Sequence, residues 1–158
     1  MDILSLPFNK FIGIEPSNDS AYLLTLPAKT EYENHIQTVH AAALFALAEA
    51  SSGLFLLREF ADIENVVPVV RNVEVKYRKP AKGAISSTAS LATVKAVVLE
   101  SLQHKHRSLV PVQVSLYDSN AVLVMQAIFE WFVLINNNPG TARSIACPGL
   151  GIMPFQGE

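Results

Sequence analysis

The feature that most constrains this chain is a long segment, residues 39–60, that is apolar on nearly every side of the helix it predicts. Its alanines and leucines favour one continuous helix, and Thr38 just before it is a suitable N-cap residue. A helix that is apolar all round must be covered over most of its surface, so the rest of the chain has to wrap around it. Between His40 and Arg58, one ionisable residue, Glu49, interrupts the apolar pattern.

A long apolar segment could also be a membrane-spanning helix. The most apolar run, residues 41–57, is slightly short for a span and carries Glu49 at its centre, followed by Ser51, Ser52 and Gly53. We therefore expect a buried helix and no membrane span. The N-terminus lacks the basic region and apolar run of a signal peptide, so we expect a cytoplasmic protein.

The rest of the chain predicts strands separated by turn residues. Val73, Val75 and Tyr77 alternate with charged residues, which is typical of a strand with one face in water. The expected strands cover residues 11–14, 21–26, 73–77, 85–99, 109–117 and 121–135. Strands grouped around a single helix indicate an α+β fold, here an antiparallel sheet of five or six strands wrapped around the helix. We expect one domain, residues 1–135, followed by a C-terminal tail, residues 136–158.

Composition excludes several classes of function. The formal net charge of −2 argues against a nucleic-acid-binding protein. Cys147 is the only cysteine, which rules out an intramolecular disulfide and a cysteine-based zinc site, and no base lies beside it in the sequence to make it a nucleophile. His104 and His106 flank a lysine in a basic turn without acidic neighbours, which is a poor set of metal ligands. We predict neither a metal nor a cofactor.

Two features of the helix carry the chemistry. Glu49 among apolar neighbours suits a general base or a nucleophile, although a structural glutamate that pairs with an arginine or caps a partner's backbone fits the sequence equally well. The free N–H groups at the helix start, near Ala41, suit a developing oxyanion. Eight residues along a helix span about 12 Å, so one carbonyl cannot contact both groups in one subunit. Two antiparallel helices across a twofold axis would join them, which makes the predicted active protein a homodimer.

Residues 34–49 resemble the signature of phenylacetyl-CoA-thioesterase-like hotdog proteins. In that signature a His stands six positions after an Asn, and an Asp or Glu stands fifteen positions after the same Asn. Asn34, His40 and Glu49 keep this spacing. The resemblance extends to residues 73–81, which look like the family's third strand and its Pro-Ala exit, and covers roughly residues 10–135. It implies the hotdog fold, in which an antiparallel sheet wraps one long helix, and a side branch of the acyl-CoA thioesterases.

The resemblance also implies roles for single residues. Asn34 would position the water or the substrate, the Ala41 backbone N–H would polarise the thioester carbonyl, and Glu49 of the facing subunit would activate water or attack directly. His40 would shape the helix start. Two departures from the signature stand in this region: Gln37 replaces a glycine, and alanines at 41 and 42 replace a glycine pair.

The implied partner is an acyl-CoA or acyl-carrier thioester. In hotdog thioesterases the CoA phosphates lie on a basic rim, for which we favour Arg78, Lys79 and Lys82; an ordinary solvated strand end remains the alternative for each of them. The favoured function is thioester hydrolysis at a dimer interface, with a dimer of dimers left open. A non-catalytic acyl-CoA-binding or regulatory module is the first alternative, which the glycine replacements favour. A hydroxyacyl-thioester dehydratase is the second.

Overall fold

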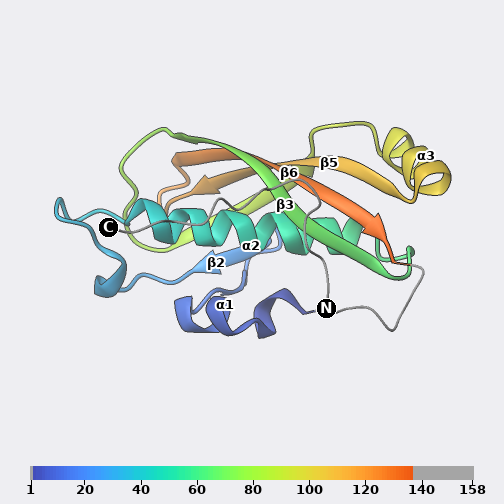
Figure 1. The fold of residues 1–158 in the computed structure, drawn as a ribbon. Coiled ribbons are helices and arrows are strands. Elements are labelled where there is room, and N and C mark those ends of the chain that lie inside the picture. The colour runs from blue at the N-terminus through green and yellow to red at the C-terminus, as the bar shows by residue number, and fades with distance from the viewer. Residues whose placement is uncertain (1, 137–158) are drawn as a thin grey trace, which may run out of the picture.

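A computed structural model, which describes residues 2–136, places the long helix α2 (Ala41–Glu59) in the hollow of a six-stranded antiparallel sheet (Figure 1). The strands are β1 (Glu15–Pro16), β2 (Leu24–Leu26), β3 (Val66–Tyr77), β4 (Ile85–Leu91), β5 (Arg107–Tyr117) and β6 (Leu123–Ile135). They are arranged in the order β1-β2-β4-β5-β6-β3. Two further helices, α1 (Pro7–Ile12) and α3 (Lys95–Lys105), and two short 3-10 helices, η1 (Ile3–Ser5) and η2 (Thr30–Tyr32), complete the described part.

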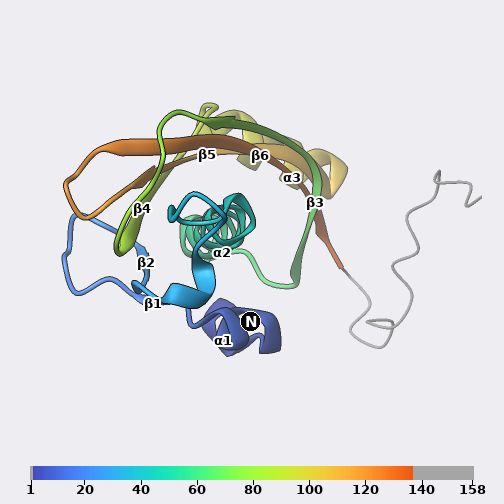
Figure 2. The same cartoon turned by 90° about the vertical axis from the view of Figure 1, so that its left-hand side faces the viewer.

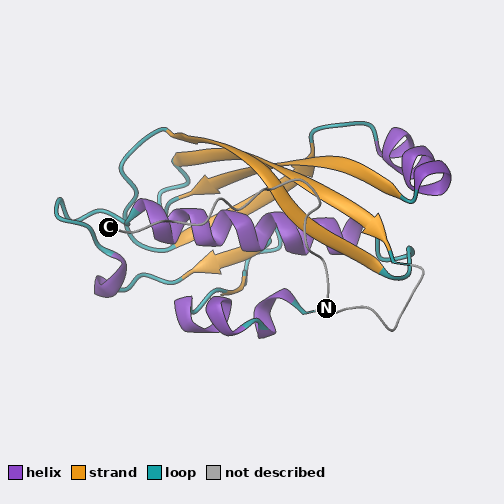
Figure 3. Ribbon diagram, in the orientation of Figure 1, coloured by secondary structure: helices purple, strands orange, loops and turns teal. Residues whose placement is uncertain are grey.

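The sheet curves over one side of α2, as the end-on view in Figure 2 shows, while α1 lies on the opposite side of the helix. Colouring by secondary structure makes the same division clear, with one long helix against a layer of strands (Figure 3). The predicted α+β architecture, an antiparallel sheet of five or six strands around one central helix, is therefore confirmed, with six strands. The predicted tail lies outside the described residues apart from Asn136, so the domain boundary stays a prediction.

The packing of α2 explains why its apolar surface needs the sheet. Leu47 and Leu56 are completely buried, and β6 lines the core with an alternating series of buried residues from Met125 to Val133. By length and composition α2 would suffice to cross a membrane, but more than half of its most apolar stretch is buried inside the fold, as in the core helix of a globular protein.

Buried hydroxyl groups tie α2 to the sheet. The Ser51 hydroxyl lies 2.7 Å from that of Ser87 on β4, which in turn donates to the carbonyl of Leu24 on β2. On the other side, the Trp131 indole N–H donates to the Ser52 hydroxyl at 3.2 Å. Since each of these groups is buried and bonded, the helix has one favoured position against the sheet.

Three local predictions are wrong. Residues 11–14 do not form a strand, because α1 occupies Pro7–Ile12 and ends at the left-handed Gly13. The strand predicted for residues 85–99 ends at Leu91, and α3 follows with Val98 and Leu102 buried four residues apart, which is the spacing of a helix face. The N-cap of α2 is His40 and not Thr38.

The strand β3 lies at one edge of the sheet. It pairs with β6 along one side only and has no strand on its other side among residues 2–136. None of its twelve residues is fully buried, although it is one of the longest strands in the sheet. A long, unpaired edge of this kind is a ready surface for pairing with another strand.

Candidate active site

The start of α2 is organised by His40. The His40 Nδ1 atom accepts the Ala42 N–H at 3.0 Å, and the His40 carbonyl accepts the N–H groups of Ala43 and Leu44. The N–H of Ala41, the first residue of the helix, has no acceptor among residues 2–136, and Ala41 is exposed. The predicted oxyanion donor is therefore the one N–H of this first turn that remains available.

Thr38 serves the preceding loop instead of the helix. The Asn34 Oδ1 atom accepts the backbone N–H groups of Ile36 and Thr38, and the Asn34 amide nitrogen donates to the Thr38 hydroxyl at 2.9 Å. The Asn34 side chain thus closes the loop in front of the helix. Its predicted role in placing water or substrate is additional to this structural one and stays a prediction.

Gln37 lies at the centre of the same loop and has a φ of 58°. This is the left-handed region, which glycine occupies without strain and other residues at a cost of roughly 1–2 kcal/mol. Gln37 stands where the resembling signature has a glycine, so this loop keeps a glycine-like backbone without the glycine.

Glu49 is partly exposed on a short stripe in the N-terminal half of α2. Ala42, Phe45 and Glu49 follow one another at helical spacing, and all three are at least partly exposed, whereas Ala48 and Ala50 beside Glu49 are buried. The Glu49 carboxylate makes no hydrogen bond or ion pair with any residue from 2 to 136. An intrachain pair with an arginine, the structural alternative weighed from the sequence, is therefore not formed in the described part.

The three cations assigned to a basic rim follow β3 and are exposed. The Arg78 Nε atom donates to the Gln126 side-chain oxygen at 2.8 Å, which holds the guanidinium over the outer face of the sheet. The backbone N–H groups of Arg78 and Lys79 both donate to the Val124 carbonyl, so this exit is fixed to β6. Arg78 and Lys79 are adjacent, and Lys82 lies three residues further on.

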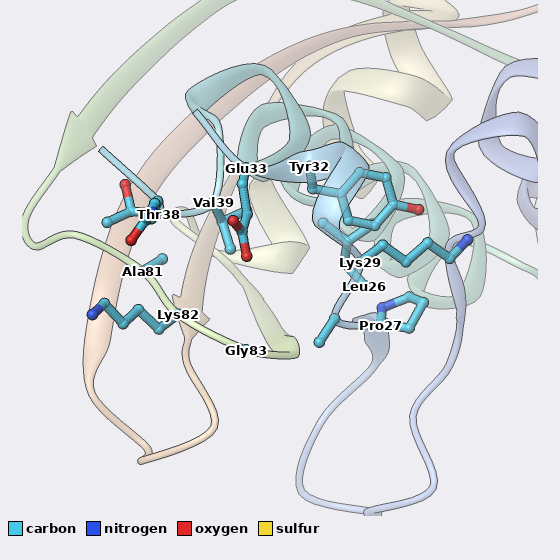
Figure 4. Close-up of a pocket in the computed structure, with 12 residues that line it drawn as sticks. Leu26, Pro27, Lys29, Tyr32, Glu33, Thr38, Val39, Ala81, Lys82 and Gly83 are labelled. Atoms are coloured by element: carbon cyan, nitrogen blue, oxygen red, sulfur yellow. The ribbon is translucent and has the colours of Figure 1, made fainter. Parts of the chain in front are cut away.

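A small pocket of about 140 Å³ lies beside the loop that precedes α2 (Figure 4). Thr38, Val39 and Ala81 line it, and Glu33 projects toward its centre. The ammonium groups of Lys29 and Lys82 lie at opposite ends of the view and do not converge. The pocket therefore brings together no pair of cations that would hold a phosphate. Among residues 2–136 there is likewise no group of three His, Cys, Asp or Glu side chains placed to hold a metal.

Sequence reasoning missed one contact at the helix start. The hydroxyl of Tyr77, the last residue of β3, donates to the Ala41 carbonyl at 3.3 Å. In the sequence, Tyr77 is only the last member of an alternating strand. No local sequence pattern predicts this contact, because the end of the strand and the start of the helix are 36 residues apart in the chain.

Known proteins resemble this chain chiefly in fold. No curated protein matches it. Among solved structures, a protein of unknown function from Pseudomonas aeruginosa described as a probable thioesterase aligns with a TM-score of 0.70, at 24% identity over 85% of this chain and 91% of the other. A thioesterase from Haemophilus influenzae aligns at 0.66, with 16% identity over 87% and 89%. A hypothetical thioesterase from Streptococcus pneumoniae, solved with coenzyme A, aligns at 0.59, with 15% identity over 80% and 89%.

These structures confirm the hotdog fold that the sequence predicts. The model of the family described as a domain of unknown function, DUF4442, matches residues 13–133, which include β1 to β5, all of α2 and nearly all of β6. The chain has the hotdog fold of thioesterase-superfamily structures and belongs to the DUF4442 family.

Proposed function

We propose that this protein hydrolyses acyl-CoA or acyl-carrier thioesters in an active site that two copies of the chain share. The observation that carries the proposal is the partly exposed Glu49 carboxylate, which lies among buried residues of α2 and has no hydrogen bond or ion pair with residues 2–136. Water and a bound substrate can reach this carboxylate, and no side chain of the described part occupies it. Glu49 is therefore available as a general base or a nucleophile.

The proposed reaction uses two groups. The Ala41 N–H donates to the thioester carbonyl oxygen and stabilises the negative charge that develops there. Glu49 takes a proton from water, whose oxygen attacks the carbonyl carbon; the C–S bond then breaks, and the departing thiolate receives that proton from Glu49. Direct attack by the Glu49 carboxylate, followed by hydrolysis of the anhydride, is the other route.

The unpaired edge of β3 supports a dimer. Antiparallel pairing of β3 with β3 of a second copy would extend the sheet and set the two α2 helices antiparallel below it. The Ala41 N–H and Glu49 of one chain are about 12 Å apart along the helix. In the proposed dimer, the Ala41 N–H of each chain would instead lie near the Glu49 carboxylate of the other chain. The interface would hold two equivalent sites.

Basic residues near the exit of β3 suit the phosphates of CoA. Arg78, Lys79 and Lys82 are exposed and follow the strand that ends beside the helix start. Of the three, Arg78 has its position set by Gln126. That a relative of the same fold, from Streptococcus pneumoniae, was solved with coenzyme A supports this choice of leaving group.

Thiol release from short, medium, long and aromatic acyl-CoAs tests the proposal. Wild type should release CoA from at least one of them, and Glu49→Gln should abolish release while the protein stays folded and dimeric. Glu64→Gln is the matched control, because Glu64 is exposed and lies beyond the end of α2. The single cysteine of the chain sets a constant protein blank in a thiol assay. Full turnover by Glu49→Gln would remove this residue from the mechanism.

One observation favours a second candidate, an acyl-CoA-binding module without turnover. The Asn34 side chain, which the resemblance assigns to the reacting groups, is bonded within its own loop to Thr38. Saturable binding of an acyl-CoA by wild type and by Glu49→Gln, with no release of CoA from either, would support this candidate and reject hydrolysis.

A further inference from the structure

The peptide unit between Ala41 and Ala42 is held at both ends by side chains. Its N–H donates to His40 Nδ1 at 3.0 Å, and its carbonyl accepts the Tyr77 hydroxyl at 3.3 Å. One bond comes from the residue just before the helix, and the other comes from the far end of β3. A first helical turn normally frays, so two side-chain bonds on one of its peptides restrict it more than the helix alone would.

This peptide adjoins the Ala41 N–H, which has no acceptor among residues 2–136. The Ala41 N–H belongs to the preceding peptide, whose carbonyl, that of His40, accepts the Ala43 and Leu44 N–H groups. The His40 N–H donates to the Tyr32 carbonyl at 2.7 Å, so the chain is also fixed one peptide earlier. The direction of the Ala41 N–H is therefore set by bonds on either side of it, and the Tyr77 hydroxyl supplies the one that comes from the sheet.

Tyr77 is suited to this task. Its backbone pairs with Met125 on β6, so the sheet and not a loop determines where the ring stands. Partial burial raises the pKa of the Tyr77 hydroxyl, which keeps it in the neutral form that donates a hydrogen bond. Tyr77 as a whole residue remains 50% exposed, so its side chain contributes little to core packing.

We propose that Tyr77 is a positioning residue of the site: with His40 it clamps the Ala41–Ala42 peptide and so aims the free Ala41 N–H at the substrate carbonyl. This inference rests on the proposed function, because it assigns the Ala41 N–H to the oxyanion. It goes beyond that function in linking the catalytic donor to the last residue of the edge strand.

Tyr77→Phe tests the clamp, because it removes the hydroxyl and keeps the ring. We expect kcat to fall about tenfold, which corresponds to the loss of one ordinary hydrogen bond in the transition state, while KM stays within about twofold. The melting temperature should change little, since the lost bond is exposed. Tyr22→Phe is the matched control and should leave kcat unchanged: Tyr22 is also half-buried, packs on Tyr117, and its hydroxyl has no hydrogen bond to residues 2–136.

Amide hydrogen exchange gives a readout that needs no turnover. In Tyr77→Phe the Ala42 amide should exchange several-fold faster than in wild type, while the Leu47 amide in the middle of α2 should not change. If wild type hydrolysed no acyl-CoA, the proposed function would fail. The Ala42 exchange rate would then test by itself whether the Tyr77 hydroxyl restrains the Ala41–Ala42 peptide. Unchanged exchange at Ala42, an unchanged kcat in an active enzyme, or a loss of kcat that merely follows a loss of folded protein would each overturn the proposal.

Discussion

Substitution of Ala41 by proline would remove the proposed oxyanion donor and leave the backbone conformation of the helix start unchanged. Ala41 is the first residue of α2, the position at which proline is favoured in helices. The preceding residue, His40, has φ −61° and ψ 138°, an extended conformation that a following proline requires. The Ala41 N–H makes no bond among residues 2–136, so its loss leaves no carbonyl without a donor there. We expect Ala41→Pro to fold and dimerise as wild type does.

The magnitude follows from the role of the donor. Removal of one oxyanion donor typically lowers kcat by about 10²- to 10³-fold, which we expect for Ala41→Pro in the acyl-CoA hydrolysis assay. Ala41→Val is the matched control, because it adds a side chain of similar bulk and keeps the N–H. Loss of activity in Ala41→Pro alone identifies the N–H as the active group, and an equal loss in both variants would instead indicate steric exclusion of the substrate.

The same variant tests whether the site is shared between subunits. In a mixed dimer of Ala41→Pro and Glu49→Gln, one site carries both substitutions and the other carries none. Random mixing makes half of the dimers mixed, so about a quarter of all sites should regain wild-type activity. The assay is hydrolysis after the two inactive proteins are unfolded together and refolded. No recovery, despite mixed dimers detected by mass spectrometry, would refute the composite site and place the whole reaction in one chain.

Three further substitutions test the packing and the loop. Gln37→Gly should raise the free energy of unfolding by about 1 kcal/mol, because it relieves a positive φ, whereas Gln113→Gly on an exposed strand position should lower it; urea denaturation measures both. Ser52→Ala should lower the free energy of unfolding by about 1–3 kcal/mol, because the buried Trp131 indole N–H loses its acceptor. A decrease smaller than the error of the measurement would show that this hydrogen bond does not stabilise the fold. Asn34→Ala should lower the melting temperature as well as turnover, since its side chain closes the loop before the helix; a stable but inactive variant would show that the residue acts in the reaction alone.

The fold was accessible from the sequence where periodicity was long and clean. The apolar helix, the alternation near Val75 and the inward face of β6 each predict their element, and the structure has all three. The errors lie where two periodicities compete. The segment that includes Val97 and Val98 is rich in β-branched residues, yet the burial of Val98 and Leu102 against the sheet selects a helix.

The candidate site was accessible only in part, for a physical reason. A helix that is apolar on every side does not reveal which side the sheet will cover, so the sequence could not say whether Glu49 points into the core or away from it. The sequence predicts Thr38 as the N-cap, because threonine is a better cap than histidine by residue type. In the structure the Thr38 hydroxyl bonds with the Asn34 side chain, and His40 Nδ1 takes over the cap.

The start of α2 and the edge strand β3 are joined through Tyr77. Among residues 2–136, β3 has no partner on one edge and the Ala41 N–H has no acceptor, and β3 ends on the residue that contacts the helix start. A second copy that paired with β3 would therefore cover the edge and approach the Ala41 and Glu49 side of α2 in the same step. Assembly and activity should consequently share one dependence on protein concentration, with specific activity falling on dilution at the concentration where the dimer dissociates. If specific activity stayed constant at concentrations where the protein is a monomer, assembly and activity would be independent. The proposal that a second chain completes the site would then be refuted.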